Sequence, residues 1–528
     1  MGLRNAHSHI SLTITDFFEQ VDGLSTEDAP PELRARIDEE LAELTDGFTR
    51  PQGEPSTGAS PGDPDAVVVD TDGEGDFETI QAAVDDPDTD PGDTILIRAG
   101  RYAPADPIDV TDPGELRLIG AGRGSDPATN TVMEQAIDVT VNDAAGNGVT
   151  LRNLRLSNAG PFDAGGDGAD LDAAFDASGP ELRDVAVENV AFVGNADEGL
   201  EIDDTDQLAV RNCLFENNAG DGINGDRVTN ATITGCTIEN NGFEGIDLDS
   251  VDSLAIENCT VRGNGGSGVE FDGDAVDLTV TDTMIADNGV AGLTAPENEI
   301  ADALIEDCTI ANNSFGGIEF AAVDGLTIRD STIEENFDGV NDPQVTDPAG
   351  VRALVRDLTV ERSRIENNGG EDLGAGIRLI GNRVESFAVL NSVIAGNAGS
   401  GVVVNGFFTG NGAADVTVQN ATVRANGNDG LVFRGDANDV TVDRAVVAEN
   451  EGSGIRFAFN DLTDVTVTDS NIRDNAEFGV ERAAGFFDSG NVGVQGCFFS
   501  DNGDGPVSGG VDRSGTRSSP VSDAGASL

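Results

Sequence analysis

The sequence contains no lysine and no tryptophan, a single tyrosine and only two histidines. All 29 basic residues are therefore arginine, against 98 acidic residues, and the formal net charge is −69. So acidic a chain lacks the basic patches that bind phosphate backbones, which argues against nucleic acid as a partner. There is also no apolar run of about 18 residues, so we expect no membrane span. The first residues lack an apolar stretch with a following cleavage site, so we expect no secretory signal.

The large negative charge needs a physical explanation. In dilute buffer, repulsion among so many carboxylates opposes compaction. At molar salt the Debye length is about 3 Å, and the repulsion is largely screened. The charge is therefore typical of proteins from salt-accumulating halophiles, and we expect this chain to be of that haloarchaeal or haloarchaeal-virus type.

An asparagine recurs along most of the chain, at intervals that begin with 23, 23, 23 and 24 residues. In most units a glycine follows four residues later and opens an apolar–x–apolar strand such as "GIDL" or "GVEF". A unit of this size cannot bury its own apolar face, but stacked units can. The asparagines are Asn195, Asn218, Asn241, Asn264, Asn288, Asn313, Asn336, Asn368, Asn397, Asn426, Asn450, Asn475 and Asn502.

The period-2 strands and Asn/Gly turns predict an all-β fold, a parallel β-helix in which equivalent residues lie one above another at about 4.8 Å. Stacked asparagine amides would then hydrogen-bond from turn to turn. All five cysteines stand five residues before one of these asparagines, which predicts a column of small buried side chains with free thiols. These are Cys213, Cys236, Cys259, Cys308 and Cys497.

The segment Val67–Tyr102 contains "DGEGDFETIQAAVDDPDTDPGDTILIRAGRY". It resembles the start of pectin-lyase-like right-handed parallel β-helix proteins, where such a segment caps the N-terminal end of the solenoid. The resemblance implies a single-stranded right-handed β-helix over residues 66–504. It also implies a short capping helix whose apolar face is formed by Phe77, Ile80, Ala83 and Val84.

The catalytic sets of that superfamily are not present intact. The "DFIFG"-type stretch of pectinesterases is absent, and polygalacturonase-like chains use a His-Gly and an Arg-x-Lys. Here the only histidines are His7 and His9, outside the predicted solenoid. The resemblance therefore implies a fold and leaves the activity open.

In four consecutive repeats the positions six and eight residues after the asparagine hold seven acidic residues and one asparagine, Asn224, and alternate with inward-pointing residues. Three interpretations remain open: halophilic surface acidity, a Ca²⁺ site, or a glycosidase pair. Among these residues the candidate catalytic carboxylates are Asp203, Asp226, Asp249 and Asp272. The candidate metal ligands are Glu201, Asp203, Asp247 and Asp249, and, in a separate acidic loop, Asp86, Asp88, Asp90 and Asp93.

Further along the same predicted face, arginines replace the acids. Together with paired phenylalanines in nearby loops, and with Phe457 and Phe459, they predict an Arg–aromatic patch that binds an acidic sugar or a protein surface. Its candidate residues are Arg378, Arg434, Arg456, Phe407, Phe408, Phe486 and Phe487.

The ends of the chain differ in composition from the repeats. Residues 1–48 carry an amphipathic helical stripe, and we expect them to form an attachment or oligomerisation arm. We expect residues 49–65 to be a flexible linker and residues 505–528 to be a low-complexity tail. We also expect a long inserted loop from Gly160 to Pro180.

Two functions remain open. The first is a rigid surface protein, which would be a spike or receptor-binding protein of a virion or cell surface. We expect such a protein to bind cell-surface glycan or protein and to form a homotrimer. Its N-terminal arm would join it to other virion or surface proteins. We expect it to assemble in the cytoplasm before release. The second is a pectate-lyase-like or glycosidase-like polysaccharide-degrading enzyme of a halophile, with Ca²⁺ as the only expected cofactor.

Overall fold

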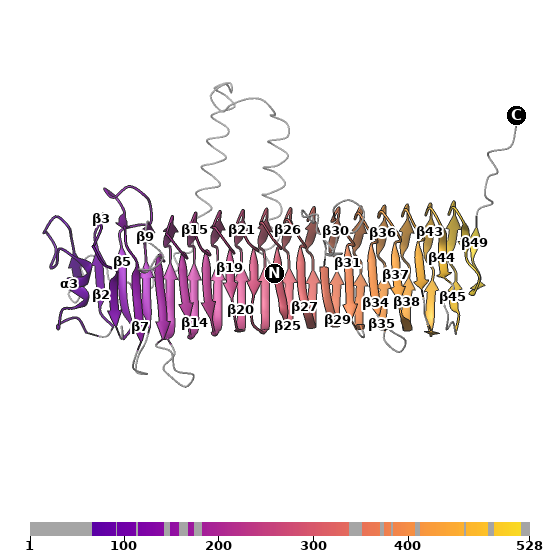
Figure 1. Ribbon diagram of the computed structural model, residues 1–528, viewed down its shortest axis with the longest axis horizontal. Helices are drawn as coiled ribbons and strands as arrows, with labels where there is room; N and C mark the ends of the chain where they lie inside the picture. Colours follow the sequence, from indigo (N-terminus) through magenta and orange to yellow (C-terminus); the bar gives the residue numbers. More distant parts are fainter. Residues whose placement is uncertain are drawn as a thin grey trace, which may run out of the picture. The chain divides into compact units, whose positions relative to one another are not determined.

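The computed structural model describes residues 66–518, except positions 91, 112–113, 142–147, 158–166, 174–181, 337–350, 370–373, 382–383, 407–411, 459–460 and 484–489. The predicted arm (1–48) and linker (49–65) lie outside the described residues. The described chain forms the predicted parallel β-solenoid, with about 15 turns and almost no helix. In Figure 1 successive turns stack side by side from the indigo to the yellow end.

Each turn contributes strands to three faces, which we name a, b and c. Face a consists of β4 (Ile108–Thr111), β7 (Ile137–Val141), β10 (Ala169–Ala173), β13 (Leu200–Asp203), β16 (Ile223–Asp226), β19 (Ile246–Leu248), β22 (Val269–Phe271), β31 (Ile377–Gly381), β34 (Val402–Gly406), β37 (Leu431–Arg434), β40 (Ile455–Ala458), β44 (Phe478–Ala483) and β47 (Gly505–Val507). Three long strands pass from face a into face b: β25 (Leu293–Glu306), β27 (Ile318–Arg329) and β29 (Val351–Glu361).

Face b consists of β1 (Val67–Val69), β2 (Thr94–Ile97), β5 (Leu116–Gly120), β8 (Val149–Arg152), β11 (Leu182–Glu188), β14 (Thr205–Arg211), β17 (Val228–Thr234), β20 (Val251–Glu257), β23 (Ala275–Thr281), β32 (Val384–Leu390), β35 (Gly412–Gln419), β38 (Asp436–Asp443), β41 (Leu462–Thr463), β42 (Val465–Thr468), β45 (Val492–Gln495) and β48 (Val511–Ser514).

Face c consists of β3 (Gly100–Tyr102), β6 (Thr131–Met133), β9 (Leu154–Ser157), β12 (Ala191–Val193), β15 (Leu214–Glu216), β18 (Thr237–Glu239), β21 (Thr260–Arg262), β24 (Met284–Ala286), β26 (Thr309–Ala311), β28 (Thr332–Glu334), β30 (Arg364–Glu366), β33 (Val393–Ala395), β36 (Thr422–Arg424), β39 (Val446–Ala448), β43 (Asn471–Arg473), β46 (Phe498–Ser500) and β49 (Arg517–Ser518).

The predicted asparagine ladder is confirmed from Asn195 to Asn502. Each Nδ2 donates to the Oδ1 of the asparagine one turn later, at 2.8–3.1 Å. The same Oδ1 also accepts the backbone N–H of the preceding asparagine, for example Asn218 N to Asn241 Oδ1 at 3.1 Å. Each buried amide is therefore satisfied on both sides, which fixes the register of neighbouring turns.

The small-residue column is confirmed as well. All five cysteines are free and buried. The backbone N–H of Cys213 approaches Cys236 Sγ at 3.5 Å, and that of Cys236 approaches Cys259 Sγ at 3.4 Å. The column therefore supplies weak acceptors to backbone groups inside the solenoid.

Glycines stand where the turns come closest. A Cβ built on Gly222 would lie 2.6 Å from the carbonyl oxygen of Gly245 in the next turn, and one on Gly245 would lie 2.6 Å from that of Gly268. Only glycine fits such an approach, which explains the glycine four residues after most ladder asparagines.

The capping helix is the short α3 (Ile80–Val84), which contacts β1, β2 and β4. Thr79 caps it by accepting the backbone N–H of Ala82, and Ile80 and Ala83 are buried as predicted. No described helix has the length and apolar character that crossing a membrane requires.

Two predicted boundaries differ from the structure. Strands β47, β48 and β49 continue the solenoid to Ser518, so the boundary at residue 504 is too early, because the Gly/Ser-rich composition conceals short strands. Within the expected loop Gly160–Pro180, strand β10 pairs with β7 and β13 and completes a turn of face a.

Candidate active site

Face a carries a file of outward acidic residues along its N-terminal half, which we name the strand file. Its register follows the prediction: Glu201 pairs with Asn224, Asn224 with Asp247, and Asp247 with Glu270. The file also extends in the other direction through three acids that the repeat pattern missed. These are Asp109, Asp138 and Asp170.

A second acidic file lies beside the first and was not predicted. Its members stand in the turn directly before the glycine that opens each face-a strand, and we name it the turn file. It consists of Asp167, Glu198, Asp221 and Glu244, followed by Ser267. Asp221 Oδ1 accepts the backbone N–H of Glu244 at 2.6 Å, and Asp167 Oδ1 accepts that of Glu198 at 3.1 Å. The "DG" or "EG" pair before each of these strands could have predicted the turn file from the sequence. Such pairs also occur in ordinary turns, so they do not single out a site.

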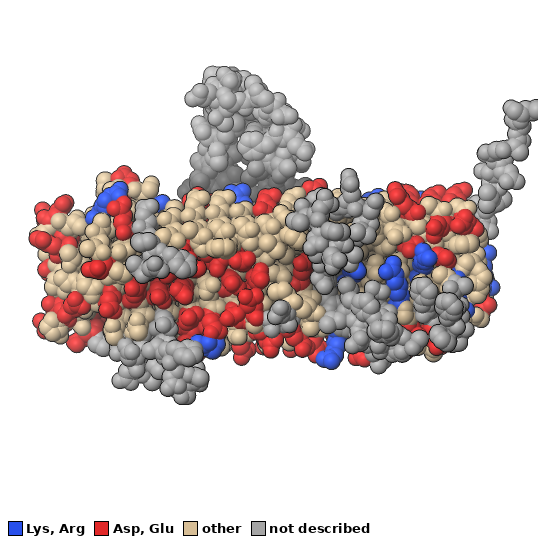
Figure 2. All heavy atoms as spheres, viewed as in Figure 1, with Lys and Arg blue, Asp and Glu red and all other residues tan. Residues whose placement is uncertain are grey.

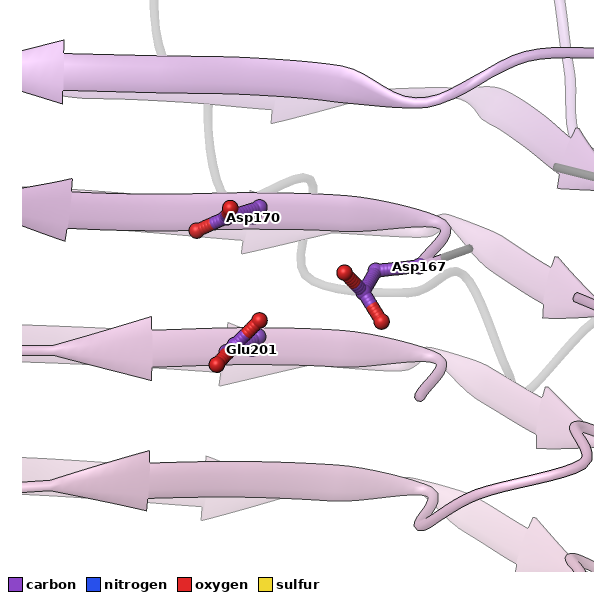
Figure 3. Close-up of side chains that lie close together, drawn as sticks. All are labelled: Asp167, Asp170 and Glu201. Carbon is purple, nitrogen blue, oxygen red and sulfur yellow. The ribbon is translucent and has the colours of Figure 1, made fainter. Parts of the chain in front are cut away.

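The two files together bring carboxylates close enough to share a cation or a proton. One oxygen each from Asp221, Glu244 and Asp247 lies within 4.8 Å of the others, and we name this group the central cluster. Asp167, Asp170 and Glu201 form a similar group, shown in Figure 3 with Asp167 in the turn and the other two on neighbouring strands. A third such group consists of Asp167, Asp197 and Glu198.

Burial gives several of these carboxyl groups a high affinity for protons. Desolvation, followed by the charges of Asp221, Asp272, Glu244 and Glu270, raises the pKa of Asp247 to about 8. Its Oδ1 is buried and has no hydrogen-bond partner among the described residues. At neutral pH the central cluster therefore retains a proton on Asp247.

The neighbouring acids shift in the same direction. Burial is the main cause that raises the pKa values of Asp221, Glu244 and Glu270. Burial, followed by a hydrogen bond with Asp167, raises the pKa of Glu198 to about 9. Several carboxyl groups on face a thus titrate together rather than independently.

The predicted catalytic candidates lie at the other end of the face-a strands. Asp203 pairs in register with Asp226, and its Oδ1 accepts the backbone N–H of Asp226 at 3.0 Å. Burial raises the pKa of both. Asp226 also contacts Arg227, which ties its carboxylate to a guanidinium. Asp249 and Asp272 follow in the next two turns, where their backbone N–H groups donate to Gly225 and Leu248.

Of the predicted metal ligands, the structure places Glu201 and Asp247 in clusters of three carboxylates, and it places Asp203 and Asp249 outside them. The acidic loop forms no such cluster among the described residues. Instead, Asp86 accepts the backbone N–H of Asp88 at 2.9 Å, and Asp93 accepts that of Asp90 at 2.7 Å. These two carboxylates stabilise a turn.

The strand file changes character toward the C-terminal end, as Figure 2 shows by its red and blue atoms. Arg378 pairs in register with Val403, Val403 with Val432, and Val432 with Arg456. Arg456 forms ion pairs with Asp429 at 3.6 Å and Glu481 at 3.3 Å, and Arg434 is exposed.

Of the phenylalanines predicted for the patch, the structure describes Phe457, and it contradicts the prediction for that residue. Phe457 points into the core, where it is 1% exposed and its ring stacks on Phe433 at 5.0 Å, because it occupies an inward position of β40. The predicted Phe407, Phe408, Phe486 and Phe487, like Phe459, lie outside the described residues.

With this geometry the chain can be compared with known proteins. The family described as "Right handed beta helix region" matches residues 130–254, 244–411 and 405–519. The chain belongs to the right-handed β-helix family. No curated protein matches it.

Solved structures share this fold. The mannuronan C-5 epimerase AlgE6 A-module of Azotobacter vinelandii is 15% identical, covers 84% of this chain and 94% of its own, and has a TM-score of 0.37. A GH87 alpha-1,3-glucanase catalytic domain is 14% identical over 88% of this chain and 70% of its own, with a TM-score of 0.29. The periplasmic alginate epimerase AlgG is 13% identical over 60% and 77%, with a TM-score of 0.31. At these identities and TM-scores the similarity carries no conclusion about this chain beyond the family match.

Proposed function

We propose that the protein is a polysaccharide-degrading enzyme whose central cluster acts on a glycosidic bond. One observation carries this proposal. One oxygen of Asp247 lies within 4.8 Å of oxygens of Asp221 and Glu244, and burial beside these carboxylates raises the pKa of Asp247 to about 8. A protonated carboxyl beside an ionised one is the arrangement that general acid catalysis of glycoside cleavage requires.

The chemistry assigns one role to each type of carboxyl. Asp247 donates its proton to the glycosidic oxygen, and the bond from the anomeric carbon to that oxygen breaks. An ionised neighbour, Asp221 or Glu244, attacks the anomeric carbon, and water later releases the sugar while Asp247 regains a proton. The oxygens of the cluster lie within 4.8 Å of one another, nearer to the 5–5.5 Å carboxyl separation of retaining enzymes than to the 6.5–9.5 Å of inverting ones.

The row formed by Asp203, Asp226, Asp249 and Asp272 is a second candidate for the same role. Asp226 contacts the Arg227 guanidinium, and among the described residues no member of this row belongs to a cluster of three carboxylates. We therefore place the central cluster first and test Asp249 beside it.

A hard cation such as Ca²⁺ also fits the clusters. Three carboxylates offer up to six oxygens, close to the number that Ca²⁺ takes. The unpartnered Oδ1 of Asp247 is the polar atom that a cation or its water would satisfy. Asp167, Asp170 and Glu201 would hold one ion. An ion held by Asp221, Glu244 and Asp247 would keep Asp247 ionised, so it would exclude the general-acid role at that cluster.

The test is release of reducing ends from a panel of neutral and acidic polysaccharides at molar salt. We expect activity from the unaltered protein and a loss of at least about 100-fold in Asp247→Asn. Asp249→Asn and Asp226→Asn test the second row. Asp252→Asn is the matched control, since Asp252 is exposed on face b of the same turn. Absence of cleavage from every polysaccharide, by the unaltered protein with and without Ca²⁺, would refute the enzymatic proposal.

A surface-attachment role is the second candidate, supported by the long regular solenoid and the exposed Arg434 at its C-terminal half. In this function the protein is a spike or receptor-binding protein of a virion or cell surface, active as a trimer. Electron microscopy of the native assembly tests whether the rod belongs to a particle. Arg434→Glu should then reduce adsorption to cells without changing the melting temperature, and unchanged adsorption would count against this patch.

A further inference from the structure

A row of residues without charge borders the turn file along one edge of face a. Three members stand directly before a turn-file residue, and the other two occupy the equivalent positions of the next two turns. Backbone hydrogen bonds of 2.8–3.2 Å link successive members. We name this row the corner file. It consists of Gly220, Phe243, Gly266, Val290 and Phe315.

Phe243 is the most exposed large hydrophobic residue of the described chain, at 60%, and Val290 is 36% exposed. By contrast, eight other phenylalanines are less than 2% exposed and fill the core. An exposed ring contributes little to folding, and exposed apolar residues that gather in one place mark binding sites. The corner file therefore offers an apolar ridge that the fold does not use.

The ridge is notched at Gly266, between Phe243 and Val290. A Cβ at Gly266 would lie 2.1 Å from Glu244 Oε1, so the glycine leaves this space to the Glu244 carboxylate. The next residue, Ser267, is 0% exposed, and its backbone N–H donates to Glu244 Oε1 at 3.5 Å. The exposed ring of Phe243 is therefore followed directly by a carboxylate that extends toward the next turn.

This combination matches the chemistry of a sugar, which has an apolar face of C–H groups and a rim of hydroxyls. An aromatic ring packs against the apolar face, and carboxylates accept hydrogen bonds from the hydroxyls. Consecutive residues have Cα atoms about 3.8 Å apart. A sugar ring stacked on Phe243 therefore brings the adjoining glycosidic bond to the Glu244 side of the central cluster.

We propose that Phe243 is the stacking platform of a sugar-binding subsite, and that the bound polymer is a neutral polysaccharide. The proposal rests on the function proposed above, because it places this subsite beside the same carboxylates. The neutral class follows from charge: Phe243 is followed directly by Glu244, whose charge acts on Asp247 together with those of Asp221 and Glu270. An acidic sugar bound beside these groups would add like charge to them.

The experiment measures both binding and cleavage with the full chain at molar salt. Affinity electrophoresis through gels containing a neutral β-glucan, a neutral mannan or the anionic polymer alginate reports binding, and reducing-end release reports cleavage. Phe243→Ala should weaken binding and raise KM by about tenfold, with kcat and the melting temperature unchanged. Phe243→Trp should restore binding.

Phe498→Ala is the matched control, because Phe498 is an exposed phenylalanine (41%) on face c near the C-terminal end. It should leave binding and KM unchanged. Equal binding by Phe243→Ala and the unaltered protein would overturn the role of Phe243, and preferential retardation by alginate would overturn the neutral class. If retardation depends on Phe243 and no polymer is cleaved, the subsite is supported and the proposed hydrolysis fails. The two proposals can therefore fail separately.

Discussion

Replacing Asp247 by asparagine should make the protein more stable at alkaline pH. The Asp247 carboxyl has a pKa of about 8 in the folded protein, against 3.8 as its ordinary value. Below about pH 4 the group is protonated in both states and contributes nothing to the pH dependence. Between about pH 4 and 8 the unfolded chain releases the proton and the folded chain keeps it, so the free energy of unfolding falls as pH rises.

The size of the effect follows from the shift. A difference of about four pKa units corresponds to a ceiling of about 6 kcal/mol. Because Asp247 is only partly buried and shares its protons with its neighbours, we expect about half, or about 3 kcal/mol. Above pH 8 the Asp247→Asn variant should therefore be more stable than the unaltered protein by about this amount, and near pH 4 the two should be equal within about 0.5 kcal/mol.

The assay is urea unfolding at pH 4, 6 and 9, at constant high salt and with a chelator present, so that no bound cation stabilises the ionised cluster. Asp252→Asn, an exposed neighbour, should show no gain at pH 9. The reasoning is refuted if Asp247→Asn is no more stable than the unaltered protein at pH 9. In a separate titration without chelator, adding Ca²⁺ should raise the free energy of unfolding of the unaltered protein. Ca²⁺ should have less effect on Asp247→Asn, because this variant has lost one ligand.

Three further predictions concern the solenoid as a whole. Asn241→Ala should lower the free energy of unfolding by about 2–5 kcal/mol in urea titrations. The substitution removes the oxygen that accepts the backbone and side-chain N–H groups of Asn218, which are buried. A loss below about 0.5 kcal/mol would mean that the asparagine ladder does not stabilise the fold. Raising NaCl from about 0.1 M to molar concentrations should increase the melting temperature, because salt screens the repulsion among the charges of a chain with a net charge of −69. A lower melting temperature at molar salt would contradict the halophilic interpretation. Arg456→Ala should lower the free energy of unfolding by about 1–3 kcal/mol at neutral pH, because the buried Asp429 loses an ion-pair partner whose own side chain is 36% exposed. An unchanged free energy of unfolding would show that this ion pair does not stabilise the fold.

The repeat made much of the fold predictable from sequence. A fixed interval between asparagines specifies which residues lie over one another, so the ladder, the thiol column and the outward position of Asp247 all followed from counting. The same counting failed where the interval is interrupted, as between Gly160 and Pro180, where strand β10 completes a turn without a ladder asparagine.

The candidate site was only partly predictable. Asp221 and Glu244 stand before glycines in turns, where acidic residues are common. Nothing in the local sequence shows that stacking brings Asp221 of the preceding turn to Glu244 and Asp247. The raised pKa of Asp247 depends on burial by atoms from neighbouring turns, which a sequence pattern does not specify. Phe457 illustrates the opposite error: its position near loop phenylalanines suggested a surface patch, while strand alternation in β40 turns its ring into the core.

The central claim is that stacking holds a proton on Asp247 at neutral pH. Difference infrared spectra between the unaltered protein and Asp247→Asn, recorded with a chelator across pH 5 to 10, test it most directly. We expect the carbonyl band of a protonated carboxyl to be present at pH 6, to disappear with a midpoint near pH 8, and to be missing from the variant throughout. A carboxylate band from Asp247 that is already fully developed at pH 6 would contradict it.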